Sequence, residues 1–398
     1  MDPILIAGAG PVGCALALFL AQNDIPIILV EAEKTLPKDL RASTFHPPTL
    51  DMLARLGVVK DMMDVGLKVE DYQYRDRRSN EIAKFNLSVL ADETDHPYRL
   101  QCEQYKMAGI AVEKLKSYPK ADVRFGTRIK GFSDVDGGVK ALVQNDEGEE
   151  YIKCSYLVGC DGSNSVVRQA GGMKFEGMTY PERFLVASTS YKFEEFFEDL
   201  SLVNYVSDPD EWCVLLRTSD LWRVLIPTPI DEDGSLFLTD DFIQDRLHRL
   251  ADNESNFDIL HKTLYRVHQR VASSYQIRDR VLIAGDAAHV NNPLGGMGMN
   301  GGVQDAINLA EKLVKIIKQG GDRQDLLSLY NRQRRGICTQ FIQEHTKKNK
   351  ALMEATDEKT QIKRQARFMK SCSDPELAKA FVMETSMINC VRDSYQIA

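Results

Sequence analysis

Apolar positions divide the first thirty residues into a strand, a helix and a second strand. A continuous apolar run at residues 3–7 is typical of a short buried strand, and apolar residues then recur at helical spacing from Val12 to Leu20. A second apolar run, Ile25 to Val30, ends at the acidic residue Glu31. The pattern predicts a βαβ unit at the start of the chain.

Further along the chain the pattern changes from helical spacing to short strands. Residues 123–159 contain short strand-like runs separated by Gly and Asp turns, which predict a β-meander. Runs at 184–192 and 202–227 are again rich in strand formers, and turns at 208–211 and 218–220 predict that the last three runs form an antiparallel sheet. Helical spacing returns at 240–252 and from residue 301 onward, and residues 322–398 are polar and helix-rich.

These elements predict an α/β (α+β) fold built around a discontinuous Rossmann-type domain. We assign residues 1–70, 100–175 and 275–335 to that nucleotide-binding domain. An antiparallel β-sheet domain for substrate, from residues 71–99 and 176–274, is inserted into it, and residues 336–398 form a C-terminal helical segment.

Composition and charge narrow the class of protein. The 398 residues are 43% apolar and 27% charged, which is typical of a globular protein with two domains. A formal charge of −8 argues against a nucleic-acid partner, and no apolar run approaches the roughly 20 residues that span a bilayer. The N-terminus is not a signal peptide, and the eight cysteines show no paired spacing. We therefore expect a cytoplasmic protein with free thiols, no membrane partner and, from the histidine spacing, no metal site.

The turn after the first strand carries the spacing G-x-G-x-x-G. Gly8 would make the turn, Gly10 would let the backbone approach a pyrophosphate, and Gly13 would let the helix pack closely on the strand. The helix N-terminus would face the phosphates and Glu31 the ribose hydroxyls. Dinucleotide binding is the interpretation that we favour; the alternative is a doubly wound sheet with a merely tight turn.

Two further glycine motifs give the chain a family resemblance. Asp161-Gly162 is followed by Arg168, and Gly285-Asp286 is followed by a Gly-rich loop at 293–298. With the first motif they resemble the single-component FAD-dependent aromatic hydroxylases, the group typified by p-hydroxybenzoate hydroxylase, over about residues 3–335. The segments that begin at Arg41 and Gln101 also look like that family.

The resemblance implies FAD as cofactor, NADH or NADPH as reductant and O2 as co-substrate. In the family, the residue matched by Asp286 hydrogen-bonds the ribityl chain, and the loop at 293–296 lies flat along the flavin ahead of a helix N-terminus. Asp161 could instead cap the following turn, and Arg168 could be a solvated helix residue. The cofactor-binding residues implied are Gly8, Gly10, Pro11, Val12, Gly13, Glu31, Arg41, Gln101, Asp161, Arg168, Asp286, Gly296, Gly298, Met299 and Asn300.

The implied reaction is hydroxylation of an electron-rich aromatic or heteroaromatic ring through a flavin C4a-hydroperoxide. The ring would be a hydroxybenzoate, a phenolic acid or a hydroxypyridine. The candidate catalytic residues are Tyr205, Arg217, Arg223, His289 and Pro293. We expect either Arg217 or Arg223, but not both, to hold a substrate anion, although solvated strand arginines are an equal alternative. For His289 we favour a buried core position over a catalytic role.

Other flavoprotein functions remain open from the sequence. A flavin halogenase would require W-x-W-x-I-P, whereas Val224 stands at the second tryptophan position after Trp222. An oxygen-independent flavin dehydrogenase and a non-catalytic redox sensor are further alternatives. The choice of ring, the choice between NADH and NADPH, and a homodimeric assembly also stay open.

Overall fold

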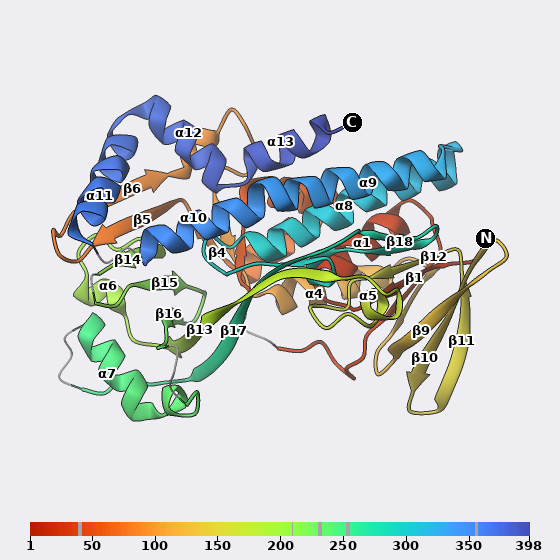
Figure 1. Cartoon of the computed structure of the whole chain (residues 1–398), viewed down its shortest axis with the longest axis horizontal. Coiled ribbons are helices and arrows are strands. Elements are labelled where there is room, and N and C mark those ends of the chain that lie inside the picture. Colours follow the sequence, from red (N-terminus) through yellow and green to blue (C-terminus); the bar gives the residue numbers. More distant parts are fainter. Residues whose placement is uncertain (39–41, 209, 230–232, 252–254, 355–356) are drawn as a thin grey trace.

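The fold is described from a computed structural model that covers residues 1–38, 42–208, 210–229, 233–251, 255–354 and 357–398 (Figure 1). A six-stranded sheet has the order β18-β19-β12-β1-β2-β8, in which only the edge pair β18–β19 is antiparallel. Its strands are β1 (Ile4–Ala7), β2 (Ile27–Val30), β8 (Ala121–Arg124), β12 (Tyr156–Gly159), β18 (Gln276–Arg278) and β19 (Val281–Ile283). The βαβ prediction is confirmed, because β1 and β2 are parallel neighbours joined by α1 (Pro11–Gln22).

The predicted meander is smaller than the sequence suggested. Antiparallel pairing joins β9 (Arg128–Val135), β10 (Gly138–Asn145) and β11 (Gly148–Cys154). Strands β8 and β12, which we placed in the same meander, belong to the six-stranded sheet instead. Every residue of β12 is buried. A short, fully buried strand shows no alternation of apolar and polar residues, so its partner strand cannot be predicted from the sequence.

A second large sheet has eight strands in the order β20-β17-β13-β16-β15-β14-β5-β6. Strands β14, β15 and β16 are antiparallel neighbours, as the turns predicted. The strands are β5 (Asp71–Asp76), β6 (Ile82–Asn86), β13 (Phe175–Thr189), β14 (Val203–Ser207), β15 (Cys213–Arg217), β16 (Trp222–Pro227), β17 (His261–Ala272) and β20 (His289–Val290). A small third sheet consists of β3 (Thr44–Phe45), β7 (Arg99–Gln101) and β4 (Leu67–Val69), and its strands alternate in sequence with those of the two large sheets.

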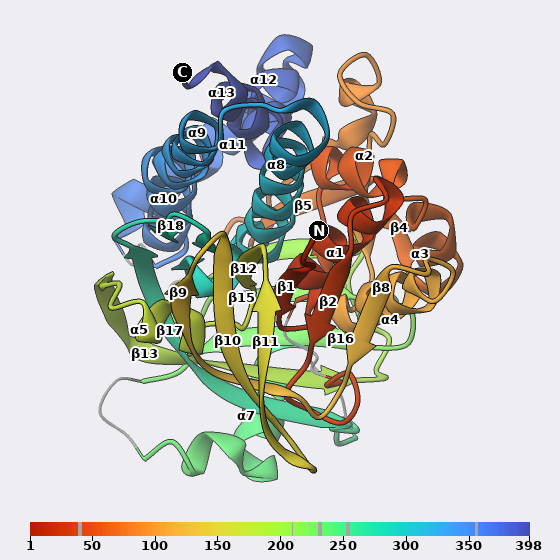
Figure 2. The same cartoon turned by 90° about the vertical axis from the view of Figure 1, so that its right-hand side faces the viewer.

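Figure 2 shows most of the helices above and to the right of the sheets, α7 (Asp240–Leu250) below them, and the antiparallel strands β9, β10 and β11 in front. Helix α8 begins at Met297, four residues before the expected start, and the predicted helix at 240–252 is α7. The remaining helices are α2 (Pro47–Arg55), α3 (Val59–Val65), α4 (Gln104–Leu115), α5 (Val166–Ala170), α6 (Phe193–Phe196), α7 (Asp240–Leu250), α8 (Met297–Gln319), α9 (Arg323–Ile337), α10 (Gln343–Met353), α11 (Glu358–Ser373), α12 (Pro375–Thr385) and α13 (Ile388–Gln396). Helix α1 packs against α8 and α4, and α11 packs against β6.

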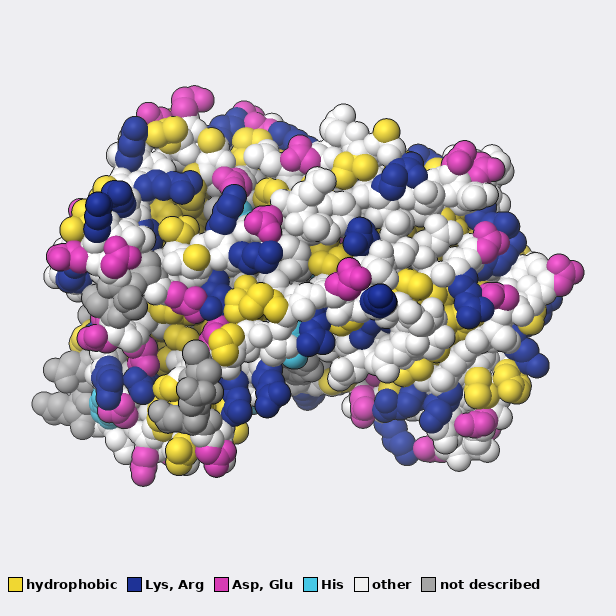
Figure 3. Space-filling model, in the orientation of Figure 1, with side chains coloured by type: hydrophobic (Ala, Val, Ile, Leu, Met, Phe, Trp, Pro, Cys, Tyr) yellow, Lys and Arg dark blue, Asp and Glu magenta, His cyan; other side chains and the backbone are white. Residues whose placement is uncertain are grey.

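Separate apolar clusters fill the two parts of the molecule. The largest lies around the six-stranded sheet, and two others cover the opposite faces of the eight-stranded sheet. On the face shown in Figure 3, acidic and basic side chains are interspersed in small groups. Within the described ranges, no helix is both long enough and apolar enough to cross a bilayer. The same ranges contain no group of three His, Cys, Asp or Glu side chains placed to share a metal ion.

Candidate active site

A continuous cavity of about 650 Å³ joins the two large sheets. We call its first part the glycine end, formed by residues 7–12, 30–32 and 160–164. The loop at 293–296 and the start of α8 form its middle. Its other part, the sheet end, is lined by Val186, Val203, Tyr205, Val214, Leu216, Arg223, Leu225, Tyr265 and Val267.

The glycine turn has the shape that a pyrophosphate requires. Gly8 has φ +101°, and a Cβ on it would lie 2.4 Å from the Cys160 carbonyl oxygen. A Cβ on Gly13 would lie 1.9 Å from the Gly8 carbonyl oxygen, whereas one on Gly10 would meet no protein atom within 4 Å. Gly10 is also the N-cap of α1 and brings no capping side chain. The first turn of α1 therefore presents backbone N–H groups to open space, which suits an anion.

Glu31 is fixed at the glycine end by the turn itself. Its Oε2 accepts a hydrogen bond of 2.8 Å from the Ala9 amide, and its Oε1 accepts one of 3.0 Å from the Glu33 amide. Pro11, Val12 and Glu31 all line the cavity, and Gly13 lies behind them against Gly8. A carboxylate held in this way can accept hydrogen bonds from sugar hydroxyls.

Asp161 and Arg168 have different positions relative to the cavity. Asp161 lines it, yet its Oδ2 accepts bonds of 2.7 and 3.2 Å from the Val166 and Val167 amides, so it also caps α5. Burial raises the pKa of Asp161, because the carboxylate loses hydration. Arg168 is buried and does not line the cavity: its guanidinium donates to the Ala287 carbonyl at 2.9 Å and the Ser163 carbonyl at 2.7 Å. Arg168 is therefore not a solvated helix residue: it joins two loops, and its contact with a pyrophosphate stays a prediction.

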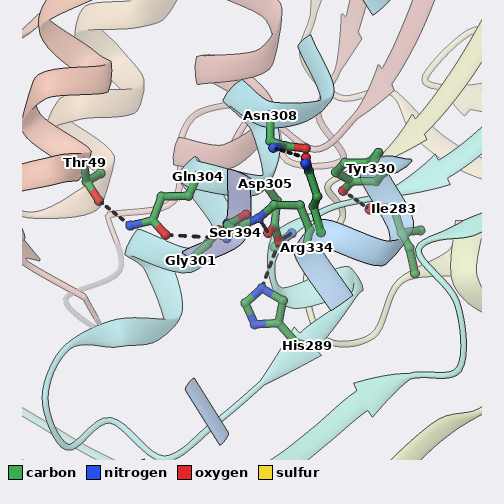
Figure 4. A network of polar contacts seen from close by, with 12 residues as sticks. Thr49, Ile283, His289, Gly301, Gln304, Asp305, Asn308, Tyr330, Arg334 and Ser394 are labelled. Atoms are coloured by element: carbon green, nitrogen blue, oxygen red, sulfur yellow. Dashed lines mark hydrogen bonds and ion pairs between the residues drawn. The ribbon is translucent and has the colours of Figure 1, made fainter. Parts of the chain in front are cut away.

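The turn at Gly285-Asp286 rests on a buried ionic network (Figure 4). Asp305 accepts a hydrogen bond of 3.1 Å from the Gly285 amide and pairs with Arg334 at 2.6 Å and with His289 at 2.9 Å. Burial disfavours the charge on Asp305, but Arg334 and His289 outweigh it and hold its pKa below the usual value. Asp286 itself is exposed and lines the cavity.

His289 lies inside that network rather than in the cavity. The imidazole is fully buried, and its ring stacks near Tyr275 with 6.1 Å between the centroids. It does not line the cavity, and this is the kind of core position that we favoured over a catalytic role.

The loop before α8 bends at two glycines and is contacted by the His46 ring. Gly295 has φ +97° and Gly296 has φ +65°, and the His46 ring contacts the Gly295 carbonyl at 2.8 Å through Nε2. Gly296, Gly298 and Met299 line the cavity as expected, and so does Pro293. Because Gly296 caps α8 without a side chain, the first N–H groups of α8 are open to an anion as those of α1 are.

Two of the expected cofactor residues lie beneath this loop instead. Asn300 is buried and donates to the Thr44 carbonyl at 2.8 Å and the Gly296 carbonyl at 2.7 Å. Gln101 is buried and accepts a bond of 3.0 Å from the Thr44 hydroxyl, while Gln104 reaches the cavity wall. The Asn300 side-chain amide is thus satisfied by backbone carbonyls under the loop, whereas the buried Nε2 of Gln101 has no hydrogen-bond partner in the described part of the chain. The assignment of both residues to the cofactor stays a prediction. Arg41 lies outside the described residues.

Strand register decides which arginine of the eight-stranded sheet faces the cavity. Arg223 pairs with Leu216 and shares its face, whereas Arg217 pairs with Trp222 on the opposite face. Arg217 stands over the Trp222 ring at 5.9 Å and does not line the cavity, so of these two arginines Arg223 is the one placed for the predicted substrate contact. Arg223 lines the cavity and lies 3.6 Å from the Glu103 carboxylate. Tyr205 lines it too and stacks on Tyr74, with 4.9 Å between the ring centroids.

The cavity also contains residues that sequence reasoning missed. Arg99 on β7, together with Ser163 and Asn164 beside Asp161, lines its wall. Ser163 and Asn164 follow directly on the Asp161-Gly162 motif, so their place in that loop was a usable signal. Arg99 had no such signal, because its position follows from strand pairing between distant segments.

Comparison with known proteins gives consistent matches along the chain. A family model described as FAD binding domain matches residues 1–345. Para-nitrophenol 4-monooxygenase from Pseudomonas sp. (strain WBC-3) is 32% identical over 396 residues, which cover 98% of this chain and 96% of that protein. 6-Hydroxy-3-succinoylpyridine 3-monooxygenase HspB from Pseudomonas putida (strain DSM 28022 / S16) is 30% identical over 337 residues, covering 83% of this chain and 84% of that protein. The crystal structure of p-nitrophenol 4-monooxygenase PnpA from Pseudomonas putida DLL-E4 superposes with a TM-score of 0.91 at 29% identity, covering 98% of both chains.

Proposed function

The chain belongs to the single-component FAD-dependent aromatic hydroxylases, and on that premise we propose that it hydroxylates a compact phenolic or hydroxypyridine ring bound at the sheet end of the cavity. FAD, when bound, accepts electrons from NADH or NADPH and activates O2 for transfer to the ring. The relatives that carry this assignment are monooxygenases, and they give no support to the halogenase, dehydrogenase or redox-sensor alternatives.

The observation that carries the proposal is the continuity of the cavity. The glycine end has two features that suit FAD: helix N-termini without capping side chains, and glycines that leave room for a pyrophosphate. We assign FAD binding there to Gly8, Gly10, Pro11, Val12, Glu31, Asp161, Asp286 and the loop at 293–299. In the domain division that we propose, these residues belong to segments 1–70, 100–175 and 275–335.

The sheet end is suited to one ring rather than several. Apart from its arginines, its walls are aliphatic and aromatic, and the same cavity must accommodate cofactor and substrate together. Apolar walls exclude water, which protects the reactive cofactor from side reactions. Pro293 and Leu294 lie where loop and ring meet, so we assign them to ring positioning. Tyr205 is placed to hydrogen-bond a ring hydroxyl.

The proposal is tested with purified, FAD-saturated protein and a panel of single rings. The panel includes 4-nitrophenol, 4-hydroxybenzoate, 3-(3-hydroxyphenyl)propionate and 6-hydroxynicotinate, each beside its methoxy analogue. We expect at least one hydroxylated ring to accelerate both NAD(P)H oxidation and O2 uptake, while its methoxy analogue does not. By mass spectrometry the product should carry one oxygen atom from labelled O2, either added at a ring C–H or in place of a displaced substituent such as nitrite. If reductant is consumed at the same slow rate with every ring and no product forms, the proposed function is wrong.

A further inference from the structure

One arginine at the sheet end is buried without a countercharge. Arg99 is 2% exposed and lines the cavity, and its Nε has no hydrogen-bond partner. Its guanidinium stands 4.1 Å from the centre of the Tyr72 ring. Within the described residues it makes neither an ion pair nor a side-chain hydrogen bond. Burying a cation in this way is unfavourable unless something else compensates it.

Each of the other buried arginines of the described chain has at least one carboxylate or carbonyl partner, although Nε of Arg223 and of Arg364 has no hydrogen-bond partner. Arg334 pairs with Asp305 at 2.6 Å, and Arg364 pairs with Asp76 at 3.2 Å. Arg168 donates to two carbonyl groups, and Arg223 lies 3.6 Å from Glu103. Arg99 therefore differs from them in lining the cavity, beside Tyr72 of the eight-stranded sheet, without a carboxylate or carbonyl partner among the described residues.

The neighbours of Arg99 do not neutralise it. Burial, with Arg99 as a second cause, lowers the pKa of His46 to about 3, so this imidazole is neutral at physiological pH. Burial raises the pKa of Tyr72 to about 12, even though Arg99 acts in the opposite direction, so the phenol stays protonated. The Tyr72 ring face adds a cation–π contact, which is weaker than a charge-assisted hydrogen bond.

We infer that Arg99, rather than Arg223 or Arg217, binds the negatively charged oxygen of an aromatic ligand at the sheet end of the cavity. This inference rests on the proposed function and names the charge state of its substrate. A guanidinium pairs well with an oxyanion, whether it is a phenolate or a ring carboxylate. If the oxygen is phenolic, the same contact favours ionisation of the bound ring and makes the ring carbon more nucleophilic.

The test measures ligand binding by equilibrium dialysis with FAD-saturated protein, so that it does not require turnover. The probes are 4-nitrophenolate, benzoate and the neutral ring nitrobenzene. The variants are Arg99→Met, Arg99→Lys, Arg223→Met and Arg217→Met, the last as a matched arginine that faces away from the cavity. FAD retention and far-ultraviolet circular dichroism check that each variant is folded.

We expect Arg99→Met to weaken binding of at least one anion by about ten- to a hundredfold, with Arg99→Lys between it and the wild type. Nitrobenzene binding should stay unchanged, which a merely structural role would not allow. The anion whose affinity falls identifies the source of the charge as phenolate or carboxylate. If Arg99→Met does not fold, the comparison of Arg99→Lys with Arg217→Met decides, because the shifted, smaller donor should still weaken anion binding.

Two results would overturn the inference. One is unchanged anion affinity in the Arg99 variants, and the other is an equal loss for nitrobenzene and the anions. A protein in which only Arg223→Met loses anion binding would return the role to that residue. In each of these cases stimulated O2 uptake by the wild type would still uphold the proposed function, so the two failures are distinguishable.

Discussion

Replacing Arg334 by Met should both destabilise the protein and weaken FAD binding. Arg334 is 2% exposed and Asp305 is fully buried, and the two are joined at 2.6 Å. The change removes the cation and leaves the carboxylate buried, which typically lowers the free energy of unfolding by about 3–5 kcal/mol. The matched control is Lys34→Met, because Lys34 pairs with Asp146 at the surface, where the two side chains are 76% and 77% exposed. An exposed pair of this kind contributes only about 0–1 kcal/mol.

The assay is urea unfolding followed by tryptophan fluorescence and circular dichroism, with FAD affinity measured separately by titration. FAD binding should weaken because Asp305 also accepts the Gly285 amide and so positions Asp286. Adding Asp305→Asn to Arg334→Met should restore part of the stability, since the uncompensated charge is removed while an acceptor remains. An Arg334→Met protein as stable as the Lys34→Met control would refute the account of the network.

Three further predictions concern the cofactor site and its support. Asp286→Ala should weaken FAD binding by about ten- to a hundredfold in a fluorescence titration. Asp161→Ala should weaken it less, because the Asp161 carboxylate already accepts hydrogen bonds from two amides of α5. Equal FAD affinities of wild type and Asp286→Ala would contradict the ribityl contact. Gly10→Ala should unfold at the wild-type temperature, because its Cβ would meet no protein atom within 4 Å, yet it should bind FAD poorly. Gly13→Ala should fail to fold, because its Cβ would collide with the Gly8 carbonyl oxygen. Wild-type FAD affinity in Gly10→Ala would show that no phosphate approaches Gly10. Burial lowers the pKa of His46 from 6.5 to about 3 in the folded protein. Between these two pH values only the unfolded state binds a proton at His46. Stability should therefore fall with decreasing pH below 6.5, by up to about 1.4 kcal/mol per pH unit from this group, and His46→Asn should reduce that slope in urea unfolding at pH 6.5 and pH 5.

The glycine turns were predictable because their requirements are local. Gly8 and Gly13 are needed by a tight strand-to-helix turn, and the spacing of the turn is written in six consecutive residues. The same holds for the βαβ unit and for the hairpin turns of the eight-stranded sheet. In those cases hydrophobic pattern and turn chemistry act over short stretches of chain.

The sheet end was predictable only in part, because it depends on pairing between distant strands. Alternation showed that Arg217 and Arg223 could not both face inward, but the register of Leu216 with Arg223 decided which one does. Arg99 is placed by β7, whose partners β3 and β4 begin more than 30 residues earlier in the chain. Asn300 could not be judged from its residue type either. An asparagine suits a ligand contact, but here its side-chain amide donates to two backbone carbonyls.

The long pair of strands β13 and β17 connects the two ends of the cavity. Figure 1 shows the two running side by side from the region of α5 towards α7, and their pairing extends from Phe175–Ala272 to Ser188–His261. One end packs on the core of the six-stranded sheet, while Val186 and Val267 line the sheet end of the cavity. Apart from an irregular stretch between Thr179 and Arg183, backbone hydrogen bonds join the two strands along their length, so this ribbon holds the two ends of the cavity at a fixed separation. Val186 on β13 and Val267 on β17 are therefore the positions at which we expect substitutions to change which ring is accepted without changing its distance from the flavin.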